Sequence, residues 1–254
     1  MFLRSIAQKG CLFLIATLLL VTTGKDWYDF YTCGAVGQCL SDAGVLQLYT
    51  KFAMSFLLTA LAFMVASKAF SPRDAKLLRV AFVFSLLADF SFSKLKILVP
   101  DAVSMSTVFG IVFFMAFQTV LIYRHSRKSE ADSNIPKVYW LLAAVTLAAA
   151  ILFATGVVGL TVATVLAYAA FVISSTVVGI LAPGKGYYPA PNASLIRWGM
   201  VIFFFGDVLV GLAMLSGEDH SAVQSIAEVA NNFIWWVYVP AQLMLIRGAV
   251  KSGA

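Results

Sequence analysis

Two apolar segments of the chain each carry one carboxylate at the same place. In segments 77–92 and 195–210 an aspartate, Asp89 or Asp207, follows an arginine by ten residues. At about 1.5 Å of rise per residue, each carboxylate would lie about 15 Å inside a membrane if the arginine marks its surface. An ionisable residue at that depth is costly and indicates a functional site. We therefore predict that the two carboxylates meet at one depth.

A pair of buried carboxylates favours acid–base chemistry. If Asp89 and Asp207 meet, they should not both ionise, so one becomes a proton donor and the other a base. Such a pair suits cleavage of an acetal, a glycoside or an enol ether, where one group protonates and the other activates water. Each aspartate alone has a second interpretation, as a structural carboxylate that accepts hydrogen bonds from neighbouring helices. Their matched depth favours the functional interpretation.

Other polar residues within apolar stretches are candidates to bind a substrate beside the aspartates. Lys51 either snorkels to the outer surface or leans inward toward an aspartate or a lipid phosphate. The remaining candidates are amides and phenols that would otherwise serve as hydrogen-bond partners between helices. They are Gln118, Tyr168, Asn231, Asn232, Tyr238 and Gln242.

Composition and hydropathy indicate the elements that must position these residues. Of 254 residues, 61% are hydrophobic and 12% are charged, about half the charge of an ordinary soluble domain. The apolar runs are too long for the strands of a transmembrane barrel. We predict an all-α polytopic membrane protein, one domain over residues 1–254, with eight transmembrane helices. They are 5–23, 44–66, 77–95, 103–123, 137–155, 158–182, 195–216 and 227–248.

The distribution of Lys and Arg predicts the orientation of these spans. With the N-terminus in the cytoplasm, the basic residues gather in cytoplasmic loops, as the positive-inside rule requires. An even number of spans then places both termini there. The net charge of +6 is thus a membrane signal and does not indicate nucleic-acid binding. A bacterial inner membrane and an endoplasmic reticulum both fit.

Two loops lead to more specific predictions. The first outer loop contains Cys33 and Cys39, which on the exoplasmic side form either a disulfide or two unpaired thiols. Loop 124–136 is polar and mixed in charge, so we expect a solvated cytoplasmic linker that includes His125.

The third and seventh spans match at an offset of 118 residues, which leads us to a hypothesis of a parallel repeat of four plus four helices.

The sequence lacks the residues that several other kinds of catalysis require. The chain has neither a GxSxG elbow nor an HExxH motif, and its two histidines cannot form a histidine-rich metal site. No lysine suits a retinal Schiff base in the final span. No metal or organic cofactor is implied, and nothing indicates an oligomeric state.

The order and spacing of short motifs over residues 44–248 resemble the YhhN-like lysoplasmalogenase family of eight-span membrane proteins. The matching segments are Tyr49-Thr50-Lys51, 84–92 (FSLLADFSF), 110–123 (GIVFFMAFQTVLIY), 167–180, 203–209 (FFFGDVL) and 234–246 (IWWVYVPAQLMLI). The family pattern carries its two aspartates onto Asp89 and Asp207 and its lysine onto Lys51. The resemblance implies hydrolysis of the vinyl ether bond of a lysoplasmalogen to a fatty aldehyde and a glycerophospho-base.

The chain departs from the family pattern near these positions. Phe52 stands where the family has proline, and Ala88 and Gly206 replace the residues before the two aspartates. Gln118 occupies the position of a histidine, and an amide cannot act as an acid or a base near neutral pH. We expect a membrane hydrolase with a lysolipid substrate and membrane lipids as partners. The rival hypothesis is a non-catalytic lipid-binding protein or a proton-coupled transporter, which a matched aspartate pair also suits.

Overall fold

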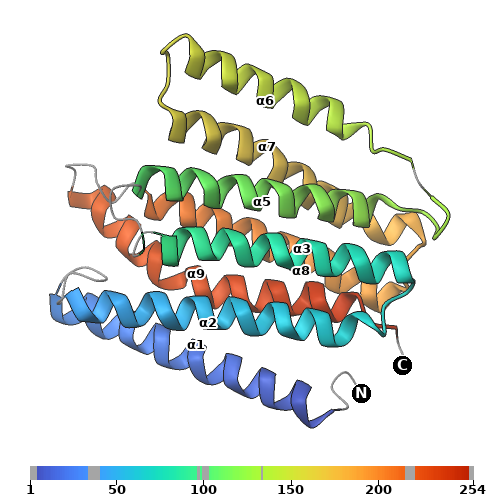
Figure 1. Cartoon of the computed structure of the whole chain (residues 1–254), viewed down its shortest axis with the longest axis horizontal. Coiled ribbons are helices and arrows are strands. Elements are labelled where there is room, and N and C mark those ends of the chain that lie inside the picture. The colour runs from blue at the N-terminus through green and yellow to red at the C-terminus, as the bar shows by residue number, and fades with distance from the viewer. Residues whose placement is uncertain are drawn as a thin grey trace.

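The computed structural model describes residues 5–33, 41–95, 98, 103–132, 134–214 and 221–251. This part of the chain contains eight long α-helices, which lie side by side in an elongated bundle (Figure 1). They are α1 (Ile6–Cys33), α2 (Ser41–Ala66), α3 (Pro72–Phe90), α5 (Val103–Ser126), α6 (Val138–Ala154), α7 (Leu160–Leu181), α8 (Ala190–Ala213) and α9 (Ser221–Gly248). A π-helical turn, η1 (Ser91–Leu95), continues α3, and a 3-10 turn, η3 (Ala182–Lys185), follows α7.

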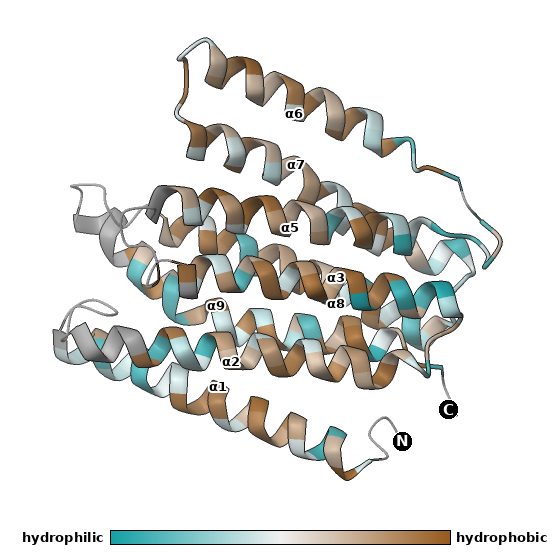
Figure 2. Ribbon diagram, viewed as in Figure 1, coloured by the Kyte–Doolittle hydropathy of each residue, from teal (hydrophilic) through white to brown (hydrophobic). Residues whose placement is uncertain are grey.

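The all-α, multi-pass architecture is confirmed. Among the described residues, six helices are long and apolar enough to cross a membrane: α1, α2, α5, α7, α8 and α9. Brown, hydrophobic positions cover the middle of these helices in Figure 2. Helix α6 is apolar but has only 17 residues, and α3 carries five charged residues in its 19. The eight predicted spans thus correspond to eight helices, two of which fall outside the length or polarity of an ordinary span.

The first helix is longer than the sequence analysis predicted. We expected it to end at residue 23, but α1 continues to Cys33. Its last turns carry charges that are accommodated by pairing: Lys25 bridges Asp29 one turn on, and Asp26 bridges Lys51 of α2. The predicted outer loop therefore begins later than expected. The predicted disulfide lies outside the described residues, since neither Cys39 nor the Cys33 side chain is described.

Six helices contact one another in a closed order, each packing on the next: α2, α3, α5, α7, α8, α9 and back to α2. Helix α1 packs outside this ring against α2 and α9, and α6 packs outside it against α7. In this order α3 lies opposite α8. The arrangement is compatible with the hypothesis of two four-helix repeats, which stays a prediction, as does the cytoplasmic location of the termini.

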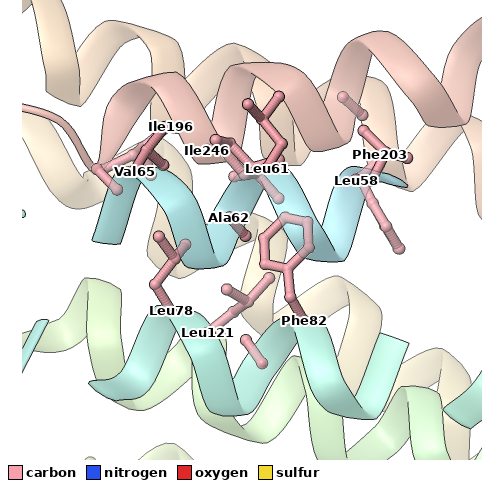
Figure 3. Packing of buried hydrophobic residues seen from close by; sticks show 14 of the residues in the cluster. Leu58, Leu61, Ala62, Val65, Leu78, Phe82, Leu121, Ile196, Phe203 and Ile246 are labelled. Atoms are coloured by element: carbon pink, nitrogen blue, oxygen red, sulfur yellow. The ribbon is translucent and has the colours of Figure 1, made fainter. Parts of the chain in front are cut away.

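Apolar side chains fill the half of the ring away from the two aspartates. Figure 3 shows Leu58 and Leu61 of α2 packed with Phe82 of α3 and Phe203 of α8, and each of these side chains is at most 2% exposed. At Gly199 of α8, an added Cβ would lie 3.2 Å from the Leu245 and Met244 side chains of α9. A small residue there lets the two backbones approach closely, as is common between membrane helices.

A buried ion pair joins two helices at the end of the ring where the core lies. Arg124 Nη2 donates to Asp74 Oδ2 at 3.0 Å, and Arg124 Nε lies 3.0 Å from Oδ1 in the ion pair. The Tyr188 hydroxyl donates to the same carboxylate at 2.8 Å. His125 is also fully buried, with a ring nitrogen 3.0 Å from Arg124. The expectation of a solvated loop is therefore wrong for these two residues, because α5 continues to Ser126 and draws them inside.

Candidate functional site

Asp89 and Asp207 line the same cavity. Helix α3 brings Asp89 to its last turn and α8 brings Asp207 to its second half, so both carboxylates lie in the half of the ring that the apolar core leaves open. The cavity, which we call the first chamber, measures about 210 Å³. Its other described walls are mostly apolar and aromatic. They are Phe92, Ile111, Phe114, Val165, Tyr168, Gly206, Val210, Gly211, Met214, Ile234, Trp235 and Tyr238.

Asp89 accepts two hydrogen bonds on one oxygen. The Ser55 hydroxyl of α2 donates to Oδ2 at 2.6 Å, and the Tyr238 hydroxyl of α9 donates to the same atom at 2.8 Å. Behind Tyr238 lies Ser85, 2.8 Å away, which receives a hydrogen bond from the Gln242 amide at 3.1 Å. Helices α2 and α9 thus hold Asp89 through hydroxyl and amide donors, with Ser85 of α3 as a link between Tyr238 and Gln242.

Asp207 has different surroundings. Its Oδ2 atom is buried and has no hydrogen-bond partner among the described residues. The Tyr168 hydroxyl of α7 lies near this carboxyl group and near the Gln118 amide, but makes no hydrogen bond of normal geometry within the described chain. Gln118 accepts a hydrogen bond from Ser175 at 2.7 Å. The predicted residues Tyr168 and Tyr238 therefore line the cavity with the two carboxylates, and Gln118 lies near Tyr168 outside the lining.

The backbone after Asp89 is unusual. Residues 91–95 form a π-helical turn, a feature that often occurs at functional sites. It turns the Phe92 side chain into the cavity wall, where the ring packs against α5 at Gly110. A Cβ on Gly110 would come within 2.5 Å of that ring, so only glycine leaves room for Phe92 in this position.

Lys51 lines a second chamber of about 270 Å³. Its ammonium group forms an ion pair with Asp26 of α1, with Nζ 3.2 Å from Oδ2. Lys51 thus pairs with an aspartate, but with one on α1 that the sequence analysis had not singled out. The charges of residues 25–29, spaced one turn apart, were the available signal for a helix that continues beyond residue 23.

The other predicted site residues do not line the first chamber. Asn231 lines the second chamber with Lys51. Gln242 does not line either chamber but supports Asp89 through Ser85. Asn232 is buried, is not among the described residues of either chamber, and has no hydrogen-bond partner for its amide within the described chain. Sequence reasoning missed Ser55, because single serines are common in membrane helices.

The fold and the site together define a class: a multi-pass α-helical membrane protein that encloses a carboxylate-bearing apolar cavity. The chain belongs to the YhhN family, whose family model matches residues 46–249. This family includes lysoplasmalogenases. The match begins within α2, so α1 precedes it. No curated protein and no solved structure matches the chain.

Proposed function

We propose that the protein hydrolyses the vinyl ether bond of a lysoplasmalogen, with Asp207 as the acid and Asp89 as the base. The observation that carries this proposal is the single cavity lined by both carboxylates, whose surroundings differ. Hydrogen bonds donated to a carboxylate favour its charged form, and Asp89 accepts two. Within the described chain, the buried Oδ2 of Asp207 has no hydrogen-bond donor, which suits a protonated group.

The first step would be protonation of carbon. Asp207 gives its proton to the vinyl carbon farther from the ether oxygen, and the double-bond electrons form the new C–H bond. The neighbouring carbon and the oxygen then share a positive charge, as in an oxocarbenium ion. The Asp89 carboxylate, lining the same cavity, stabilises this charge through electrostatic attraction in a site of low dielectric.

The second step would be addition of water. Asp89 takes a proton from a water molecule while the oxygen of that water bonds to the charged carbon. The product is a hemiacetal. Asp89 then returns this proton to the ether oxygen while the ionised Asp207 takes the hydroxyl proton. The C–O bond breaks to release a fatty aldehyde and a glycerophospho-base. Both aspartates regain their starting states, so no cofactor is consumed.

Gln118 would support this chemistry without taking part in proton transfer. Its amide lies near Tyr168, which in turn lies near Asp207, so it is placed to orient a hydroxyl or a water molecule. Because both aspartates are present, the replacement of the family's histidine does not remove either proton-transfer group of the proposed mechanism.

The test is release of aldehyde from lysoplasmenyl-ethanolamine by the purified protein in detergent. We expect activity in the wild type and a loss of at least about 100-fold in Asp89→Asn and in Asp207→Asn, since general acid and base catalysis each contribute about 10²–10⁴-fold. Asp132→Asn, at a partly exposed loop position outside both chambers, is the matched control and should be as active as the wild type.

A folded wild type that releases no aldehyde would contradict the proposal. The rival functions would then be tested in sealed vesicles, where a proton-coupled transporter needs a gradient and a lipid-binding protein does not. Unchanged activity in either Asn variant would overturn the roles of the aspartates while leaving the reaction in place.

A further inference from the structure

The two chambers share one wall, and Asp89 is part of it. The first chamber contains Asp207, and the second contains Lys51 and Asn231. They share six described lining residues. These are Asp89, Phe92, Val210, Met214, Ile234 and Trp235. A molecule that occupied both chambers would lie along this shared wall, which includes the Asp89 carboxylate.

The two chambers differ in polarity. Besides the aspartates and two tyrosines, the first chamber is apolar. The second adds Lys51, Ser93, Thr107 and Asn231 to its walls, and Lys51 is the single cation among its described lining residues. Such a cavity matches an amphiphile with one apolar chain, whose polar end carries a negative charge near Lys51.

The position of Lys51 relative to Asp89 is fixed by α2. Ser55, which donates to Asp89, lies four residues after Lys51, so the two side chains share one face of the helix. Four residues rise about 6 Å along the axis. In a lysoglycerophospholipid, five bonds separate the ether oxygen from phosphorus, which is also about 6 Å when extended.

Asp26 determines where the ammonium group lies. Its carboxylate oxygens are 3.2 and 3.5 Å from Lys51 Nζ, and the residue is fully buried. The neighbouring Asp29 is occupied by Lys25 and by the Gln47 amide. Asp26 therefore acts on Lys51 from α1, a helix that precedes the part of the chain matched to the family.

We propose that the second chamber is the head-group site, where Lys51 binds the phosphate of a single-chain phospholipid and Asp26 is the positioning residue that aims Lys51 at it. This inference rests on the proposed function for the identity of the substrate. The hydrocarbon chain then lies in the first chamber beside Asp207, and the vinyl ether bond lies at Asp89 between the two. This orientation matches the proposed roles, because the carbon to be protonated is on the chain side.

The test is equilibrium binding of two uncleavable lipids of equal chain length to the purified protein in detergent. One is lysophosphatidylethanolamine with an ester-linked chain, and the other is the monoacylglycerol that lacks its phosphate. A hydrogen bond between charged groups corresponds to about 10- to 100-fold in affinity, so we expect the wild type to prefer the phospholipid by at least about tenfold. Equal affinity of the wild type for both lipids would overturn the proposal, and this comparison needs no variant.

Variants separate the two roles. Lys51→Met should lower phospholipid affinity to that of the monoacylglycerol and leave monoacylglycerol affinity unchanged. Asp26→Asn should weaken phospholipid binding several-fold without affecting the monoacylglycerol, and Asp26→Glu should restore most of the loss. Tighter phospholipid binding in Asp26→Asn would show that Asp26 merely competes with the phosphate, which contradicts positioning. Lys9→Met, which removes an exposed lysine of α1 that lines neither chamber, should behave as the wild type.

The binding and cleavage experiments test the head-group site and the proposed reaction separately. A protein that prefers the phospholipid but releases no aldehyde would retain the head-group site and lose the proposed reaction. A protein that cleaves alkenylglycerol as efficiently as lysoplasmalogen would retain the reaction and lose the head-group site.

Discussion

At the scale of single residues, the proposed chemistry depends on two identical side chains in unlike surroundings. Asp89 is held by hydroxyl donors from two other helices, whereas one oxygen of Asp207 lacks a donor within the described chain. Pairs of titratable groups whose environments differ are a recurrent basis for dividing acid and base roles. The hydroxyl of Tyr238 is the group that most distinguishes the two aspartates.

Replacing Tyr238 by Phe should therefore impair catalysis without disturbing the packing. The ring remains, but Asp89 loses one of its two donors and the connection to Ser85. A hydrogen bond to a charged group contributes about 1.5–3 kcal/mol, so kcat should fall by about 10- to 100-fold. The matched control is Tyr139→Phe, whose hydroxyl donates to the Thr119 carbonyl away from the cavity. Full activity in Tyr238→Phe would contradict the assigned role of Asp89.

Sequence alone was sufficient to single out the two catalytic candidates and three residues around them. Asp89 and Asp207 stand out because a carboxylate is rare in an apolar helix, and Gln118, Tyr168 and Tyr238 because each is a polar residue within an apolar stretch. Ser55 and Asp26 were not predicted. A serine gives no signal in a membrane helix, and Asp26 follows the point where hydropathy falls and a helix end is expected.

At the scale of elements, the ion pair between Asp74 of α3 and Arg124 of α5 fixes the helix that carries Asp89. Both side chains are completely buried, and burial raises the pKa of Tyr188, which keeps its hydroxyl protonated as the donor to Asp74. Breaking a buried pair leaves an uncompensated charge, which costs about 3–5 kcal/mol.

The variant Asp74→Asn should accordingly lower the thermal midpoint of the protein in detergent. The loss comes from the Arg124 charge, which stays buried without its counter-ion. Asp132→Asn provides the comparison, because Asp132 is partly exposed, its side-chain hydrogen bonds lie at the surface, and it makes no buried ion pair in the described structure. A midpoint that is unchanged in Asp74→Asn would show that the pair contributes nothing to holding α3 against α5.

Helix boundaries were predicted with unequal success. Helices α3, α8 and α9 begin five or six residues before the predicted spans 77–95, 195–216 and 227–248. Helices α6 and α7 begin and end within about two residues of the predicted spans. Helix α1 extends ten residues beyond its predicted end, and α5 carries Arg124 and His125 into the bundle. Hydropathy counts a charged residue as exposed and contains no information about a partner on another helix.

At the scale of the whole molecule, the orientation predicted from Lys and Arg is open to direct test. The loops after α5 and after α6 should lie on opposite sides of the membrane. In a variant without native cysteines, Ser129→Cys should resist a membrane-impermeant maleimide in intact cells, and Thr155→Cys should react. Both positions are exposed, so accessibility differs only by side. The reverse pattern would place the termini and the chambers in the opposite orientation.

The most direct test of the central claim is the position of deuterium in the product. Hydrolysis in heavy water should give a fatty aldehyde with one deuterium on the carbon next to the carbonyl, because an exchangeable acid protonates that carbon before water adds. An aldehyde without this deuterium would contradict the protonation of the vinyl ether by Asp207, whatever the rate of the reaction.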